Sequence, residues 1–329
     1  MTSLTLTCIG RQQNTHDVVS WQLAPLSGSL PPVLAGQCIT LHTEIDGQPE
    51  CRAYTLSSSP QDACWQVTIK DVGRVSRHLH QTLQVGDKIR VDGPFGDFNL
   101  TALPCERPLL LSAGSGITPM WSMLRDELAK RPDADIRFIH SARSPADVIF
   151  ADDLATLAAA HSGVRHALIL EEAPADHPWI GRLTPAMLAE LAPDLRERHV
   201  YLCGPAPYMA AVSAMLAELG LPPEQLHQES FGLPPAEPAT TTSDHFWLTL
   251  KKSGKKVKIL PGQTLLAALE AAGETMMAAC RAGVCGSCRC TTTGDIERQS
   301  VMTLSAQDLE SGVALACSCT AKGDISLDY

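Results

Sequence analysis

The chain contains 329 residues, of which 44% are hydrophobic, and carries a formal net charge of -10 at pH 7. That length is more than one ordinary hydrophobic core can serve, so two or three domains are expected. The acidic balance argues against a nucleic-acid partner, and the apolar runs fall far short of the ~20 residues that a membrane-spanning helix requires. The alternation from Leu4 to Cys8 predicts a β-strand and not an export signal, so we expect a cytoplasmic protein without membrane association.

Short strands dominate the first part of the chain, residues 1–103. Apolar and polar residues alternate at 18–23, 37–43, 65–70 and 88–91, and clusters of Gly, Pro, Ser and Asp separate these stretches. Regularly spaced short strands with turn residues between them predict an antiparallel β-barrel.

Strand and helix patterns alternate in residues 104–232. Apolar stretches such as PLLLS and HVYLCG each precede a segment with helical periodicity, which predicts an α/β domain with a parallel sheet covered by helices. Residues 233–243 are rich in Pro and Thr, lack periodicity and predict a linker. Residues 244–329 predict a third domain with a hairpin, one short helix and a loop rich in Cys and Gly.

Six of the twelve cysteines gather near the C-terminus. Cys280, Cys285, Cys288 and the distant Cys317 have the spacing C-x4-C-x2-C…C, which is the plant-type [2Fe-2S] arrangement. A structural zinc site is the alternative, but two C-x2-C pairs would be expected for zinc. The sequence therefore predicts an iron-sulfur cluster held by these four thiolates.

Neighbouring residues support this loop. Gly283 and Gly286 allow its backbone to fold closely around a cluster and to direct N–H groups at the sulfur atoms. Cys290 and Cys319 each lie two residues beyond a predicted ligand, and we interpret them as bystanders.

A phosphate- and flavin-binding pattern lies in the predicted barrel, at Arg52, Tyr54 and Thr55, followed by the turn from Gly73 to Ser76. An Arg can clamp a phosphate, an aromatic ring can lie against an isoalloxazine, and a hydroxyl can bond near flavin N5. The Gly-x-x-Ser turn can offer N–H groups to a pyrophosphate. Such a strand is also ordinary barrel sequence, but its position ahead of a nucleotide-type domain favours the flavin role.

A dinucleotide-type loop, Gly114 to Pro119, lies between a predicted strand and a predicted helix. Its glycines allow a pyrophosphate to approach the helix N-terminus, where the dipole and free N–H groups favour anions. Cys203 ends a later strand at the edge where such sheets bind ligands. The alternative for Cys203 is a small buried hydrophobic residue.

Together these motifs resemble the ferredoxin-NADP reductase superfamily in its one-chain form with a C-terminal plant-type [2Fe-2S] ferredoxin domain. The resemblance covers nearly the whole chain and implies a flavin-binding β-barrel, an NAD(P)-binding α/β domain and a β-grasp ferredoxin domain. The stretches CRAYTLSSSP, SAGSGITPMWSM, CGPAPYM and ACRAGVCGSC look most like members that reduce the hybrid-cluster protein. Reductase components of Rieske-type oxygenases share the same order and most of the motifs.

The resemblance also implies roles for individual residues. Those placed at the flavin are Arg52, Tyr54, Thr55, Gly73, Val75, Ser76 and Phe231. Those placed at the nicotinamide dinucleotide are Gly114, Gly116, Thr118, Cys203 and Pro205. Thr55 and Cys203 would flank the point of hydride transfer, and Glu229 aligns loosely with an acidic residue near the flavin.

These features predict an NADH-dependent oxidoreductase. Nicotinamide releases two electrons together as hydride whereas an iron-sulfur cluster accepts one, so a flavin must stand between them. We expect FAD, with FMN as the alternative. NADH is favoured over NADPH because Arg143 is one basic side chain where a 2′-phosphate would sit, and Asp147 would repel that group.

The expected acceptor is a protein, the hybrid-cluster protein, with a Rieske-type oxygenase component as the alternative. A hypothesis of another class is a flavin and iron-sulfur redox sensor that signals its oxidation state without steady turnover. The complete nicotinamide site argues against the sensor, because a sensor needs no dedicated hydride donor.

Overall fold

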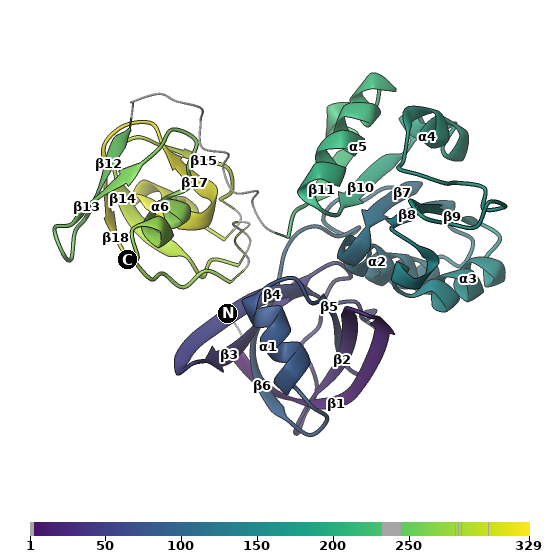
Figure 1. The fold of residues 1–329 in the computed structure, drawn as a ribbon, viewed down its shortest axis with the longest axis horizontal. Coiled ribbons are helices and arrows are strands. Elements are labelled where there is room, and N and C mark those ends of the chain that lie inside the picture. Colours follow the sequence, from purple (N-terminus) through teal and green to yellow (C-terminus); the bar gives the residue numbers. More distant parts are fainter. Residues whose placement is uncertain (1–2, 232–244, 280, 282, 284, 302) are drawn as a thin grey trace. The chain divides into compact units, whose positions relative to one another are not determined.

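The computed structural model forms two compact units (Figure 1). The first consists of the described residues up to 39 together with 54–230, and the second of 40–53 together with the described residues from 231 onward. The predicted linker at 233–243 lies outside the described residues. The structure describes residues 3–231, 245–279, 281, 283, 285–301 and 303–329.

An antiparallel sheet with strand order β4-β3-β6-β1-β2-β5 contains the N-terminal strands. Leu6 and Cys8 of β1 are fully buried, as expected where alternate residues of a strand face the core. The indole Nε1 of Trp21 donates to the carbonyl oxygen of Leu83 at 3.1 Å, which ties the end of α1 to the sheet. The elements are β1 (Ser3–Thr15), β2 (Val18–Pro25), β3 (Cys38–Ile45), β4 (Gln48–Thr55), β5 (Trp65–Lys70), α1 (Arg74–Thr82) and β6 (Lys88–Phe95).

A parallel sheet with strand order β11-β10-β7-β8-β9 follows. Its strands are β7 (Pro108–Ala113), β8 (Ile136–Ala142), β9 (Val164–Leu170), β10 (His199–Cys203) and β11 (Leu226–Glu229). Its helices are α2 (Ile117–Lys130), α3 (Ala151–Ala160), α4 (Pro185–Leu191) and α5 (Ala206–Glu218). Short 3-10 turns lie at η1 (Gly114–Gly116), η2 (Pro145–Asp147), η3 (Leu195–Glu197) and η4 (Pro223–Gln225).

Both faces of the parallel sheet are covered by helices. Leu110 and Phe138 belong to the cluster that α2 and α3 cover, whereas their neighbours Leu111 and Ile139 belong to the cluster beneath α4 and α5. Adjacent strand residues point to opposite faces, so the continuous apolar runs of the sequence fill both cores. The predicted α/β domain is confirmed.

The C-terminal part of the second unit has a mixed sheet, β13-β12-β18-β14-β16, and a two-stranded sheet, β15-β17. Leu265 and Leu269 of α6 pack with Leu248 and Leu327 of the mixed sheet, as expected for a small α+β domain. Its strands are β12 (Phe246–Leu250), β13 (Lys256–Ile259), β14 (Arg289–Thr293), β15 (Ile296–Arg298), β16 (Val313–Leu315), β17 (Cys319–Ala321) and β18 (Ile325–Asp328). Its helices are α6 (Leu265–Ala271), α7 (Ala306–Glu310) and the 3-10 turn η5 (Ala316–Ser318).

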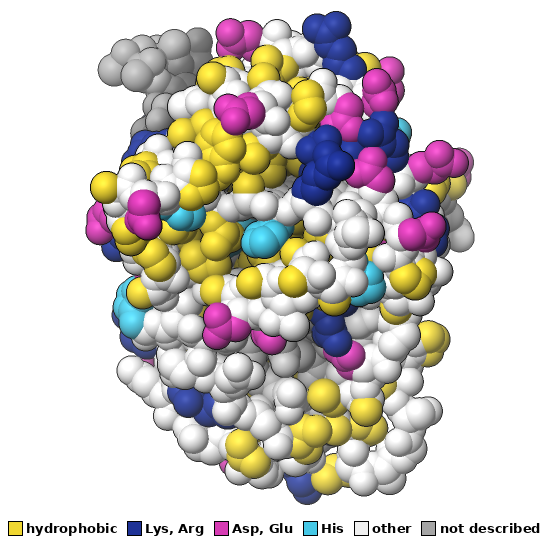
Figure 2. All heavy atoms as spheres, turned by 90° about the vertical axis from the view of Figure 1, so that its right-hand side faces the viewer, with side chains coloured by type: hydrophobic (Ala, Val, Ile, Leu, Met, Phe, Trp, Pro, Cys, Tyr) yellow, Lys and Arg dark blue, Asp and Glu magenta, His cyan; other side chains and the backbone are white. Residues whose placement is uncertain are grey.

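Among the described residues, no helix combines the length and the apolar character needed to cross a membrane. Figure 2 shows one face of the molecule, on which Lys and Arg side chains are interspersed with Asp and Glu.

A network of ion pairs lies at the amino ends of the parallel strands. Arg198 is fully buried and donates to Asp194 and Asp135, each at 2.8 Å. Arg137 donates to Asp194 at 2.9 Å, and Arg107 contacts both carboxylates. The segments that enter β7, β8 and β10 are thus joined through shared charges.

We expect Asp194→Asn to lower the free energy of unfolding by about 3 kcal/mol, because it leaves a buried guanidinium without its full partner. Hydrogen bonds from Arg198 and then Arg137 hold the pKa of the Asp194 carboxyl well below its ordinary range. A carboxyl with a lowered folded pKa stabilises the fold above its unfolded pKa of about 3.9, and that contribution disappears as the pH falls through the folded value. Urea denaturation followed by circular dichroism, at neutral pH and in acid, measures both effects.

Asp133→Asn is the matched control, because it removes an exposed carboxylate from the same region. The control should unfold like the unmodified protein. Equal losses in the two variants would show that the ion-pair network does not stabilise the domain.

Candidate functional site

The carboxyl ends of β7 and β10 lie side by side at the point where the strand order reverses. In open α/β sheets this switch point is where ligands bind. A Cβ atom on Gly116 would lie 2.3 Å from the carbonyl oxygen of Cys203, and Gly114 has a φ of +52°. Only glycines therefore allow η1 to turn and to lie directly against the end of β10.

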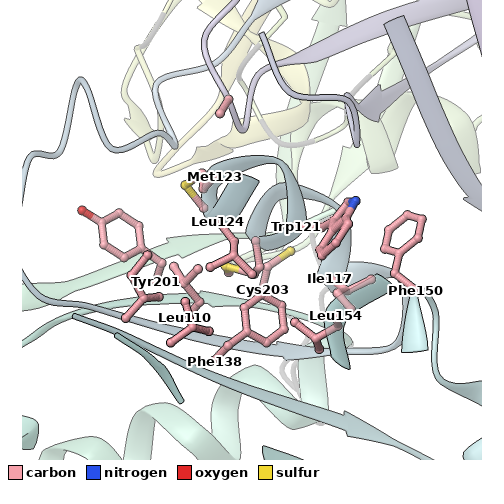
Figure 3. Close-up of a cluster of buried hydrophobic side chains, with 14 of the residues drawn as sticks. Leu110, Ile117, Trp121, Met123, Leu124, Phe138, Phe150, Leu154, Tyr201 and Cys203 are labelled. Carbon is pink, nitrogen blue, oxygen red and sulfur yellow. The ribbon is translucent and has the colours of Figure 1, made fainter. Parts of the chain in front are cut away.

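Cys203 is fully buried, and its side chain lies in the apolar cluster with Ile117 and Leu124 (Figure 3). Burial raises the pKa of its thiol well above the ordinary value, and the nearby Glu229 carboxylate adds to this effect. Cys203 is thus a neutral, small and apolar group at the ligand-binding edge. Its burial agrees with the interpretation as a small core residue, and its role at the nicotinamide stays a prediction.

Three predicted site residues meet in the first unit. Cys203 pairs with Glu229 across β10 and β11. The Thr55 hydroxyl, at the end of β4, donates to the Glu229 carboxylate at 3.5 Å and is 5% exposed. The strand that carries the flavin motif therefore ends beside the carboxyl edge of the parallel sheet.

Arg52 and Tyr54 are both half-buried on β4. The Arg52 Nη1 donates to the carbonyl oxygen of Cys51 at 2.7 Å and lies 3.7 Å from a carboxylate oxygen of Glu50. These contacts orient the guanidinium against its own strand. Its partial exposure fits a residue that also contacts a phosphate.

The turn before α1 is closed by its own serine. Ser76 Oγ accepts from the N–H groups of Gly73 at 2.9 Å and Val72 at 3.1 Å, and it donates to the Gly73 carbonyl at 3.1 Å. The Gly73 N–H, which the motif suggested for a pyrophosphate, is therefore engaged by Ser76. A Cβ on Gly73 would meet no atom within 4 Å, so the backbone at this end of α1 is open to the approach of a phosphate group, and the pyrophosphate role of the turn stays a prediction.

The other predicted cofactor residues have mixed surroundings. Val75 is 2% exposed, and its side chain packs in the hydrophobic core. Thr118 is also 2% exposed, and its hydroxyl donates to the carbonyl oxygen of Ser115 at 3.1 Å, so it fixes the dinucleotide loop from within. Pro205 is exposed at the N-cap of α5. Phe231 is 45% exposed.

Three of the four predicted cluster ligands are described, and each is almost fully buried. The Gly283 N–H donates to Cys317 Sγ at 3.2 Å, and Ser287 Oγ lies 3.1 Å from Cys285 Sγ. Buried thiols that receive such hydrogen bonds are the environment that an iron-sulfur cluster requires. The described ligands are Cys285, Cys288 and Cys317, whereas Cys280 lies outside the described residues.

The loop backbone depends on glycine. Gly283 has a φ of +73°, and a Cβ there would lie 2.7 Å from the side chains of Ser300 and Ser318. Among the described residues, no three His, Cys, Asp or Glu side chains converge on one metal position. A two-iron cluster divides its four thiolates between two irons, so three of them need not converge.

Sequence reasoning missed two supports of this loop. Ser287 Oγ accepts from the Ala279 N–H at 2.8 Å, and Arg281, at a φ of +56°, donates to Glu270 of α6 at 3.0 Å. That ion pair raises the pKa of Arg281. Ser287 had no signal beyond its place between two ligands, and the sequence marked Arg281 as a basic residue beside the cluster but gave no sign of its pairing with Glu270.

Cys290 and Cys319 belong to the hydrophobic core of the C-terminal domain. Cys290 Sγ lies 3.6 Å from the carbonyl oxygen of Ala314, and burial raises the pKa of Cys290 to about 12. Both thiols pack as small core residues.

Comparison with known families gives three matches in chain order. Residues 12–100 match the model of an oxidoreductase FAD-binding domain. Residues 110–214 match an oxidoreductase NAD-binding domain, and residues 248–322 match a 2Fe-2S iron-sulfur cluster binding domain.

Individual proteins resemble the chain over most of their length. The glycine betaine monooxygenase reductase subunit of Chromohalobacter salexigens is 36% identical over 86% of this chain and 83% of its own. The NADH oxidoreductase HCR of Escherichia coli is 35% identical over 91% of this chain and 89% of its own. The structure of phthalate dioxygenase reductase, described as a modular structure for electron transfer from pyridine nucleotides to [2Fe-2S], matches with a TM-score of 0.63 and 26% identity over 99% of this chain and 98% of that one.

The order of the three matched domains, the antiparallel and parallel sheets and the buried cysteine loop agree with one another. The resemblance stated from the motifs is confirmed, including FAD, [2Fe-2S] and nicotinamide as the redox groups. This chain belongs to the ferredoxin-NADP reductase superfamily, as an oxidoreductase whose FAD- and NAD-binding domains precede a C-terminal [2Fe-2S] domain.

Proposed function

We propose that this protein is the NADH-dependent reductase component of an oxygenase system and delivers single electrons to a separate oxygenase component. When bound, FAD accepts hydride and releases electrons singly, and the [2Fe-2S] cluster carries them onward. The meeting of Thr55, Cys203 and Glu229 supports this function most strongly, because it joins the flavin strand to the nicotinamide edge. The name of the glycine betaine monooxygenase reductase subunit supports an oxygenase as the acceptor.

The hybrid-cluster protein, the acceptor expected from the sequence, is the second candidate. The NADH oxidoreductase HCR of Escherichia coli and the stretches that resemble such reductases support it. A cytoplasmic location belongs to the same proposal, because thiolate ligation of a [2Fe-2S] cluster requires cysteines that are kept reduced.

The domain boundaries are also proposed. Residues 1–103 bind the flavin, 104–232 bind the nicotinamide dinucleotide, 233–243 form the linker and 244–329 hold the cluster. Each family match lies within one of these segments, which supports the division.

We assign the residues to steps as follows. Arg52, Tyr54 and the N-terminus of α1 hold the flavin and its phosphates. Gly114 and Gly116 admit the dinucleotide to the switch point. Thr55 and the neutral thiol of Cys203 flank the transferred hydride and exclude water, so no general base is required.

The acceptor is tested by mixing the NADH-reduced protein with the purified oxygenase component, or with the hybrid-cluster protein, of the same organism. We expect the oxygenase component to reoxidise the [2Fe-2S] cluster rapidly in stopped-flow absorbance. Rapid reoxidation by the hybrid-cluster protein alone would replace the oxygenase proposal with the second candidate. Flavin that NADH does not reduce would contradict both candidates.

NADH preference has support at the end of β8. The N–H of Glu172 donates to the carbonyl oxygen of Arg143 at 2.7 Å, and that of Glu171 to Ala142 at 3.2 Å. Two acidic residues thus extend β9 beside the loop where the ribose 2′ position would lie. Asp147, which accepts from the Ser144 hydroxyl at 2.6 Å, adds a further carboxylate.

We therefore expect kcat/KM for NADH to exceed that for NADPH by about tenfold or more, because a 2′-phosphate would approach like charges. Glu172→Gln should narrow this ratio by removing one of them. Steady-state reduction of ferricyanide measures both values. Glu190→Gln, an exposed change on α4, is the control that should not alter the ratio. Equal kcat/KM values for the two cofactors in the unmodified protein would contradict the preference.

Replacing Cys288 with Ser should abolish the electron paramagnetic resonance signal of the reduced cluster, because this thiol lies in the buried ligand loop. NADH should still bleach the flavin absorbance, since Thr55 and the dinucleotide loop belong to the other compact unit. The matched variant Cys290→Ser changes a neighbouring buried thiol and should keep the signal. Loss of the signal in Cys290→Ser would reassign the ligands.

A further inference from the structure

One face of helix α2 contacts the flavin domain through hydrogen bonds and an ion pair. Ser122, Arg125 and Asp126 follow the spacing i, i+3, i+4 and therefore share a face. The Ser122 hydroxyl donates to the carbonyl oxygen of Ser58 at 2.6 Å, in a buried contact. The side-chain amide of Gln61 donates to Asp126 at 2.8 Å. Both partners belong to the loop between β4 and β5.

The third contact is a two-point ion pair. Arg125 Nη1 and Nη2 donate to the two carboxylate oxygens of Asp62, each at 2.7 Å. Asp62 is fixed in turn by the Ser59 N–H at 2.9 Å, and the guanidinium carbon of Arg125 lies 5.8 Å from the centre of the Trp121 ring. A planar guanidinium bound at two points fixes orientation as well as distance.

This pair is better suited to geometry than to stability. The side chains of Arg125 and Asp62 are 31% and 29% exposed, and pairs so accessible contribute little to the free energy of folding. They line an open cavity of about 300 Å³ together with Leu128 and Leu157. A smaller side chain at Arg125 therefore needs no rearrangement of the core.

These contacts join helix α2 to the loop between β4 and β5. Both segments lie next to residues that we assign to hydride transfer. Helix α2 begins directly after the dinucleotide turn η1, and its sheet-facing side is held by Ile117 and Leu124 (Figure 3). The loop between β4 and β5 begins directly after Thr55. Any slide of α2 along the barrel would therefore move the glycine turn relative to Thr55.

We propose that Arg125 and Asp62, with Ser122 and Asp126, are positioning residues for hydride transfer, and that they set the separation between the nicotinamide and the flavin. The inference rests on the proposed roles of Thr55 and the glycine turn. Hydride transfer requires reacting atoms about 3–3.5 Å apart, and a misplacement of about 1 Å can cost about 100-fold in rate. These contacts affect the rate of hydride transfer and not the affinity for FAD or NADH.

The test is anaerobic stopped-flow reduction of the FAD-loaded protein at saturating NADH. Arg125→Ala should lower the limiting rate of flavin reduction about tenfold or more. The FAD content of Arg125→Ala and its Kd for NADH should remain unchanged. NADH with deuterium at the transferred position should reduce the flavin more slowly, with the full primary isotope effect. Arg131→Ala is the control, because Arg131, the C-cap residue of α2, pairs with Glu127 of that helix and its loss should leave the rate unaltered.

A variant with the two charges exchanged distinguishes loss of the ion pair from misfolding. Asp62→Ala should match Arg125→Ala, and the combined variant Asp62→Arg with Arg125→Asp should recover most of the lost rate. An unaltered limiting rate in Arg125→Ala overturns the inference. A slow rate caused by lost FAD or weakened NADH binding overturns it as well. If NADH fails to reduce the unmodified protein, the proposed function fails first and the inference with it.

Discussion

A Cβ atom at Gly116 would lie 2.3 Å from the carbonyl oxygen of Cys203 and 2.7 Å from the Gly204 nitrogen, so the backbone of η1 lies against the backbone of β10. The functional edge depends on this approach. It places the start of α2 and the end of β10 at one point, and β11 then adds Glu229 beside Cys203. Thr55 reaches the same point from the flavin strand.

The two kinds of redox step place different demands on the protein. Hydride transfer needs two reacting atoms in near contact and in a fixed orientation. Accordingly, Thr55, the glycine turn and the Asp62–Arg125 pair all belong to one compact unit. Transfer of a single electron to a cluster requires proximity but no bond-forming alignment. The cluster loop can therefore belong to another unit, where it is supported by local hydrogen bonds such as that from Gly283 to Cys317.

Features encoded in short stretches could be predicted from the sequence. The βαβ rhythm gave the parallel sheet, because apolar runs in such strands are buried on both faces. The glycines at 114, 283 and 286 could be predicted as special positions, and each has a positive φ. The cysteine spacing was informative for the same reason, since a cluster loop is a local structure.

Contacts between distant segments could not be read from the sequence. Gln61 and Asp126 are 65 residues apart, and neither segment contains a sequence pattern that predicts contact with the other. The motif at Gly73 was misleading in one detail, because a serine that can bind a phosphate can also accept the N–H groups of its own turn. Local spacing specifies which groups are near one another in the chain, but not which of them are already engaged.

The two ends of the parallel sheet divide the work of stability and function. At the amino ends, three arginines pair with three carboxylates, so the charges compensate one another and the strands are held together: Arg107, Arg137 and Arg198 with Asp135, Asp194 and Glu197. At the carboxyl ends, glycine replaces side chains and Cys203 stays neutral, so the edge has room for a ligand and carries no thiolate charge to repel one. A buried ion-pair network at the functional edge would fill that space. The extended ion-pair network thus lies at the amino ends, whereas the carboxyl ends carry the glycine turn, Cys203 and the carboxylate of Glu229.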